Sequence, residues 1–258
     1  MMSHNLLLFS ITIFLGVLIS NTSMLNISHG LGDMSSAQSN ITNQDGIVQN
    51  IYRNKIMSFD NNVKNIVLLI PNEGHKSPTL PQEQRIINQP YVPVNIIVGQ
   101  NTKTAWINGD VGHKHSITVV DKNSQPLYSS GKFVFNNVTN PLILNDSGKH
   151  VYSESNVNKD DPKFIMKGTI VVQDDLSKTS QLPETVCFLM VSTKDLSKHL
   201  SALKGNGIDI IAKYTFKDLR GEQKGAGPQQ TLLVLGSSNS KDKLVSVLQS
   251  ITPTLPYS

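Results

Sequence analysis

The histidines of this sequence are the residues whose type and spacing could bind a metal ion. His113 and His115 are two residues apart, so on a β-strand both would project from the same face. His150, Tyr152 and Glu154 also alternate, and on one strand these three would point together. Imidazoles and carboxylates are ligands for Cu(II), Zn(II) or Fe(II). A His-x-His pair in a turn rich in Asn and Gly is also typical of a solvated loop.

Nucleophilic and phosphate-binding chemistry find little support in the sequence. Cys187 is the single cysteine and lies in an apolar run, residues 186–191, which predicts a buried, inert thiol and no intramolecular disulfide. No serine stands in a Gly-x-Ser-x-Gly elbow. The Gly-rich segment 221–227 is not followed by Gly-Lys-Ser/Thr, so it indicates a hairpin loop and not a phosphate loop. We therefore expect a protein that is not an enzyme.

Composition limits the partners of the chain. Its 258 residues carry a formal net charge of +4 without any run of consecutive Lys or Arg. A nucleic-acid binder normally shows a clustered basic stripe, so we expect no nucleic-acid partner. Only 16% of the residues are charged and 38% are hydrophobic, which is typical of a folded protein and not of a disordered polyelectrolyte.

The N-terminal residues have the pattern of an export signal. Residues 6–19 form an apolar run, which is shorter than the ~20 residues of a membrane span but fits the h-region of a signal peptide. We predict a signal peptide or an uncleaved anchor over 1–20, and hence an extracytoplasmic protein, secreted or tethered to the outer face of the membrane. Five Asn-x-Ser/Thr sequons are compatible with a glycosylated exterior surface; they lie at Asn21, Asn26, Asn40, Asn137 and Asn145.

The following residues divide into a tether and an all-β region. Residues 21–62 are rich in Asn, Ser, Gln and Gly, and we interpret them as a flexible tether. From 63 to 173, short apolar runs alternate with turn signals, which predicts a β-sandwich. The expected strands are 65–70, 94–98, 102–108, 115–121, 132–135, 150–155 and 168–173.

A second domain is predicted over 184–258, after a polar linker at 174–183. Strands are expected at 185–192, 208–217 and 230–236, with helices at 194–206 and 241–251. In the strand 208–217 the residues alternate strictly, with Ile208, Ile210, Ala212, Tyr214 and Phe216 on one side. The order β-α-β-β-α describes a small α+β, ferredoxin-like arrangement without its last strand.

Four motifs in order resemble the cupredoxin (plastocyanin/azurin) family over residues 63–173. The segment 91–110 contains Trp106-Ile-Asn108-Gly-Asp110, and His115 begins the next strand. The segments 148–154 and 164–172 resemble the approach to the metal and the closing Met-x-Gly strand. The resemblance implies a Greek-key β-sandwich in which His115 matches a copper ligand and Met166 matches the axial ligand.

The sequence departs from this family where the metal would be held. Glu154 occupies the position of the family's cysteine, and no histidine occurs between Glu154 and Met166. A blue-copper site needs a thiolate, two imidazoles and a weak axial Met, so we predict no blue site. The remaining candidate is a non-blue site for copper or zinc made by His115, His113 and Glu154 beside Met166. Weaker candidate ligands are His150, Asp160 and Asp161.

Two functions compete at this point. The first is binding of copper or another transition metal at the His/Glu site, for handling or storage. The alternative is an interaction or structural module that keeps the sandwich and binds no metal. Electron transfer follows only from the family resemblance. A protein partner would use the C-terminal domain, a membrane tether would use the N-terminus, and the sequence does not indicate the oligomeric state.

Overall fold

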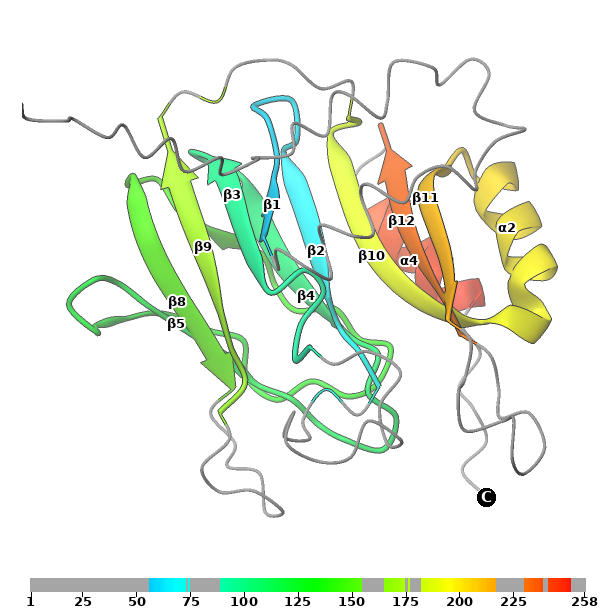
Figure 1. The fold of residues 1–258 in the computed structure, drawn as a ribbon, viewed down its shortest axis with the longest axis horizontal. Coiled ribbons are helices and arrows are strands. Elements are labelled where there is room, and N and C mark those ends of the chain that lie inside the picture. The colour runs from blue at the N-terminus through cyan, green and yellow to red at the C-terminus, as the bar shows by residue number, and fades with distance from the viewer. Residues whose placement is uncertain are drawn as a thin grey trace, which may run out of the picture.

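The computed structural model describes residues 56–72, 74, 89–154, 165–174, 176, 182–216, 230–238 and 241–251. The predicted signal peptide or anchor, most of the predicted tether and the Gly-rich loop lie outside these residues. Within them the chain is mostly β-sheet, arranged as two mixed six-stranded sheets (Figure 1). No helix of the described part is long and apolar enough to cross a membrane.

The first sheet holds the predicted metal-binding strands. Its order is β1-β3-β9-β8-β5-β6. Parallel pairing joins β1, β3 and β9, and antiparallel pairing joins β9, β8, β5 and β6. The strands are β1 (Ile56–Ser58), β3 (Asn95–Gly99), β5 (Ile117–Val120), β6 (Pro126–Ser129), β8 (Gly148–Glu154) and β9 (Lys167–Gln173).

The second sheet combines strands from both ends of the chain. Its order is β11-β12-β10-β2-β4-β7. Strand β2 pairs in parallel with β4 on one side and with β10 on the other. The strands are β2 (Asn65–Ile70), β4 (Lys103–Asn108), β7 (Leu142–Ile143), β10 (Thr185–Ser192), β11 (Asp209–Phe216) and β12 (Gln230–Ser237). The expected linker 174–183 thus leads from the first sheet into the second, and the second sheet is continuous across both halves of the chain.

The core forms where side chains of the two sheets meet. Trp106 of β4 and Tyr152 of β8 are both fully buried, and their ring centroids are 5.3 Å apart. Phe59, just after β1, meets Phe188 of β10 edge to face at 6.5 Å. These contacts bring the apolar faces of the two sheets together, as the alternating sequence pattern predicts for a sandwich.

The C-terminal elements follow the predicted order β-α-β-β-α. After β10 come the short 3-10 helix η5 (Thr193–Asp195) and α2 (Leu196–Gly205), then β11, β12 and α4 (Lys241–Ile251). Leu203 of α2 and Leu244 and Leu248 of α4 are buried in the core. In the second sheet β10 has β12 on one side and β2 on the other.

Several elements differ from the sequence prediction. The predicted tether ends before Ile56, because Met57 and Phe59 are buried and β1 pairs with β3. The strand expected at 132–135 does not form, and only Phe133 makes an isolated bridge, to His115. In β11 a bulge between Ile210 and Ala212 shifts the register.

The bulge has a direct consequence for the expected alternation along β11. Ile211 and Ala212 are consecutive and both buried, whereas Tyr214 is exposed. The prediction that residues 208, 210, 212, 214 and 216 share one face is therefore wrong, because a β-bulge inserts one extra residue and reverses the faces beyond it.

Candidate functional site

His115 is the centre of the site, and its backbone is fixed before β5 begins. Its N–H donates to the carbonyl of Phe133 at 3.0 Å, and the N–H of Phe133 donates back to its carbonyl at 2.9 Å. The side chain is almost fully buried. The imidazole therefore cannot exchange its partners for bulk water without a change in the surrounding structure.

Both nitrogen atoms of the His115 ring contact carboxylates. Nδ1 lies 2.6 Å from Oε2 of Glu154, and Nε2 lies 3.1 Å from Oδ2 of Asp110. The other oxygen of Glu154 accepts the backbone N–H of Ser116 at 2.8 Å. We call Asp110, His115 and Glu154 the triad. All three side chains are buried, with relative exposures of 0%, 3% and 5%.

The sheet register brings Glu154 to the imidazole. Glu154 is the last residue of β8 and is opposite Ile117, the first residue of β5, in the antiparallel ladder. Its own N–H donates to the carbonyl of Met166 at 3.1 Å. The sequence placed Glu154 beside His115 through the family resemblance, and the structure places these side chains in direct contact.

Asp110 is positioned by Asn108, the last residue of β4. The N–H of Asp110 donates to the side-chain oxygen of Asn108 at 2.8 Å. The Asn108 amide group in turn donates to the carbonyls of His113 at 2.9 Å and Phe133 at 3.2 Å. The Asn-Gly-Asp segment after Trp106 is thus a buried turn that aims one carboxylate at the ring.

The charge state of His115 follows from these contacts. Burial by itself would lower the pKa of an imidazole, but hydrogen bonds and charge interactions with Asp110 and Glu154 outweigh burial and raise the pKa from 6.5 to about 9. At neutral pH His115 is therefore an imidazolium that donates from both nitrogens. An imidazolium has no lone pair with which to bind a metal ion.

Two buried tyrosines pack together, and Tyr91 is near enough to Glu154 of the triad to interact with its charge. The rings of Tyr91 and Tyr152 are 4.8 Å apart, and both side chains are fully buried. Burial, together with the nearby Tyr152 and Glu154, raises the pKa of Tyr91 well above its ordinary value. Burial also raises the pKa of Tyr152, so both phenols stay neutral at physiological pH.

His113 lies apart from the buried pair. Its side chain is 49% exposed, and its Nδ1 is 3.5 Å from Oδ1 of Asp110. Gly112 has a φ of +83°, and the N–H of His113 donates to the carbonyl of Asp110 at 3.4 Å in a turn. That His113 and His115 share one strand face stays a prediction: His113 follows the turn at Gly112 and precedes the strand β5, and both imidazoles approach the carboxylate of Asp110.

The remaining candidates are also placed by the structure. Met166 is buried and is joined to Glu154 through its backbone carbonyl. His150 shares the buried face of β8 with Tyr152 and Glu154, as the alternation predicted, but lies four residues from Glu154, or about 13 Å along a strand. Its Nε2 is 3.3 Å from the carbonyl of Asp146. Asp160 and Asp161 lie outside the described residues.

The donor groups in this region do not fit a blue-copper centre. Cys187 lies in β10 of the other sheet, is fully buried, and has a pKa raised by burial. Within the described residues, no group of three or more His, Cys, Asp and Glu side chains is arranged so that it could hold a metal ion. The residue that sequence reasoning missed is Asp110; its signal was the Asn-x-Asp spacing after Trp106.

Comparison with known proteins gives likenesses in fold only. No family model and no curated protein matches the chain significantly. Among solved structures, it is similar to a purple cupredoxin from Nitrosopumilus maritimus (20% identity, 42% of this chain, 99% of that chain, TM-score 0.32). It is also similar to rusticyanin (14%, 46%, 85%, 0.32) and to auracyanin from Roseiflexus castenholzii (11%, 43%, 97%, 0.32). At these values the likenesses carry no argument about a metal or an activity in this chain.

Proposed function

We propose that this chain is a cupredoxin-like protein of the cell exterior that works without a metal, as an interaction or structural module. The observation that carries the proposal is the double engagement of His115, whose two ring nitrogens each contact a buried carboxylate. The imidazolium places one positive charge between the two buried carboxylates of Glu154 and Asp110. Its two contacts are charge-assisted hydrogen bonds, which are roughly twice as strong as neutral ones.

A metal ion would have to displace the ring proton. Metal binding requires a neutral imidazole, and a pKa of about 9 leaves about 1% of the ring neutral at pH 7. That protonation alone weakens metal binding at His115 about 100-fold. The ion would also have to separate a carboxylate from the ring at a contact of 2.6 Å.

The location outside the cytoplasm is supported by the apolar N-terminal run and by the position of two sequons. Asn137 and Asn145 are both exposed and lie in loops between strands. Glycosylation acceptors must be accessible at the surface of the folded protein, and these two satisfy that condition. Sugar at Asn145 would stand at the loop before β8.

Metal binding is the competing function, and one observation favours it. Asp110 lies close to both histidines, with contacts of 3.1 Å to His115 and 3.5 Å to His113, and coordinating atoms around one ion have similar separations. A change of the His113 turn and loss of the proton from His115 would have to accompany binding there.

Elemental analysis and calorimetry separate the two functions. We expect protein purified without added metal to contain no stoichiometric copper or zinc. Titration with Cu(II) or Zn(II) at pH 7 should detect no binding site that depends on His115. His115→Ala should therefore give the same titration as the parent protein, and so should the control His199→Ala, which changes a buried histidine of α2. One equivalent of tightly bound metal that disappears only in His115→Ala would establish the competing function.

A further inference from the structure

Four aromatic side chains make an unbroken series of ring contacts through the sandwich. The ring centroids of Tyr91 and Tyr152 are 4.8 Å apart, and those of Tyr152 and Trp106 are 5.3 Å apart. Trp106 is in turn stacked on Tyr128, with 5.9 Å between ring centroids and 28° between ring planes. Tyr91, Tyr152 and Trp106 are fully buried, whereas Tyr128 is only partly buried. The series therefore leads from the core to the surface.

The sheet register explains why Trp106 lies against two tyrosines. Tyr128 of β6 and Tyr152 of β8 are both opposite Val119 of β5, one on each side of that strand. Residues directly opposite one another in antiparallel strands project from the same face of the sheet. Trp106 of β4 belongs to the second sheet and meets both phenol rings on this face. The pairing of β5 with two neighbours thus fixes the position of both tyrosines.

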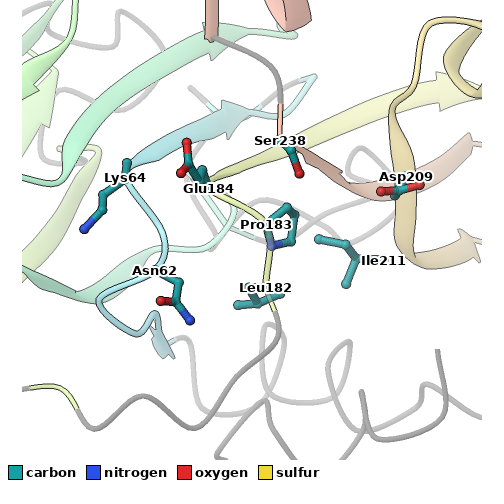
Figure 2. Close-up of a pocket in the computed structure, with 8 residues that line it drawn as sticks. All are labelled: Asn62, Lys64, Leu182, Pro183, Glu184, Asp209, Ile211 and Ser238. Carbon is teal, nitrogen blue, oxygen red and sulfur yellow. The ribbon is translucent and has the colours of Figure 1, made fainter.

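The aromatic series is separate from the hollow at one end of the second sheet. Figure 2 shows that hollow among Lys64, Glu184 and Asp209, and no aromatic side chain lines it. What the four residues share is contact between rings. Electron exchange falls steeply with distance and is fast between rings in contact, and Trp and Tyr are the aromatic side chains that lose one electron most readily. The series can therefore carry an electron between core and surface.

The three tyrosines differ in where a proton can go, and a phenol that loses an electron must also release its O–H proton. The hydroxyl of the buried Tyr152 donates to the carbonyl of Val94 at 2.7 Å. The hydroxyl of Tyr91 is buried and has no hydrogen-bond partner among the described residues. The hydroxyl of Tyr128 donates to the carbonyl of Asn140 at 2.6 Å in an exposed position. Of the three, Tyr128 is the one whose proton can pass to water.

Trp106 cannot release a proton in the same way. Its Nε1 is buried and makes no hydrogen bond within the part of the chain that the structure describes. An indole ring that loses an electron here keeps its N–H proton and stays a radical cation. Such a ring is restored by an electron from a neighbouring side chain, and the stacked phenol of Tyr128 is in contact with it.

We propose that Tyr128 returns an electron to Trp106 after one-electron oxidation of the core, as the surface end of a protective relay. Ultraviolet light moves one electron from Trp106 to dioxygen, which becomes superoxide. Tyr128 then gives one electron to the Trp106 radical cation and its O–H proton to water, which leaves a neutral phenoxyl radical. A hydrogen atom from a small thiol restores the phenol and leaves a thiyl radical. The relay uses neither His115 nor a metal, so it is independent of the function proposed above.

Flash photolysis tests the relay, because the chain has a single tryptophan. The full chain is excited at the long-wavelength edge of indole absorption, with a cobalt(III) ammine complex as the electron acceptor, which is reduced to cobalt(II). We expect the absorption of the tryptophan radical to decay at the rate at which that of a phenoxyl radical grows. Tyr128→Phe keeps the stacked ring and removes the O–H. In this variant the phenoxyl signal should be lost and the tryptophan radical should live longer.

Two control variants and one isotope measurement complete the experiment. Tyr152→Phe removes a buried phenol that also contacts Trp106, and Tyr214→Phe removes an exposed phenol of β11; both should keep the phenoxyl signal. In deuterium oxide the unaltered protein should show a slower decay of the tryptophan radical, because the proton leaves together with the electron. The proposal is overturned by a phenoxyl signal that persists in Tyr128→Phe or disappears in Tyr152→Phe, or by equal decay rates in the two solvents.

Discussion

The imidazole of His115 and the carboxylate of Glu154 are in direct contact, with 2.6 Å between Nδ1 and Oε2. Glu154 is the residue that stands in place of a thiolate in the sequence motif, and the structure gives it a different task. It accepts a hydrogen bond from Nδ1 of the ring, while Asp110 accepts one from Nε2. A positively charged side chain is thus enclosed by the protein's own anions.

The first prediction concerns stability and pH. The pKa of His115 is raised from 6.5 to about 9 in the folded protein, so its stabilising contribution is complete below pH 6.5 and is lost as the pH rises through 9. The loss amounts to about 3 kcal/mol at most. Urea unfolding at pH 6 and at pH 10 should show this fall. His115→Gln should remove most of it; an equal fall in that variant would assign the effect to other groups.

The second prediction concerns the removal of one carboxylate. Glu154→Ala leaves a buried imidazolium with one counter-ion and leaves the Ser116 N–H without its acceptor. We expect the free energy of unfolding to decrease by about 3 kcal/mol and the pKa of His115 to fall. Chemical denaturation measures the first change, and histidine NMR titration measures the second. Asp146→Asn, at an exposed loop position, should alter stability by less than about 0.5 kcal/mol.

The third prediction concerns colour. Protein mixed with Cu(II) should show no intense blue absorption, because that band needs a thiolate bound to copper. The thiol of Cys187 is fully buried in β10. Visible absorption spectroscopy before and after addition of copper is sufficient. An intense band that persists in Cys187→Ser would require a ligand set other than the one described.

The fourth prediction concerns the two halves of the chain. The sequence predicts two domains, 63–173 and 184–258, but β2 of the first pairs with β10 of the second, and we expect this pairing to make the folding of the two parts interdependent. We expect limited proteolysis to cut within 174–183 while the two pieces remain associated during size-exclusion chromatography. A fragment ending at 173 should aggregate by itself, because β2, buried over five of its six residues, would become an open hydrophobic edge. A monomeric, stable fragment would show that 63–173 folds without β10 and would contradict this interdependence.

Sequence patterns predicted the apolar elements well. The bounds of β2, β10 and α4 agree with the expected 65–70, 185–192 and 241–251, because each is a clear apolar run or an amphipathic period between turn signals. Strands β6 and β7 were missed, since β6 is largely exposed and β7 has two residues. Short edge strands carry no periodic signal long enough to detect.

The site was predicted only in part, for a physical reason. His115 and Glu154 were paired through a resemblance, but the role of Asp110 depends on a turn held by the Asn108 side chain. Spacing also could not show that Gly112 has a positive φ in the turn before His113, or that the His113 side chain is half exposed. Such local hydrogen bonds compete with the regular strand pattern on which the sequence argument rested.

Strand β2, which pairs with both β4 and β10, affects the order in which the protein can fold. One neighbour of β2 is β4, close in sequence, but the hydrogen bond from Asn65 to Thr185 spans 120 positions of the chain. During synthesis from the N-terminus, the edge of β2 that pairs with β10 therefore stays unpaired until β10 has been synthesised. Loop closure over such a separation is slow, so the second sheet is completed late in folding. Until then, the unpaired edge of β2 in a newly made chain must be protected from pairing with other chains.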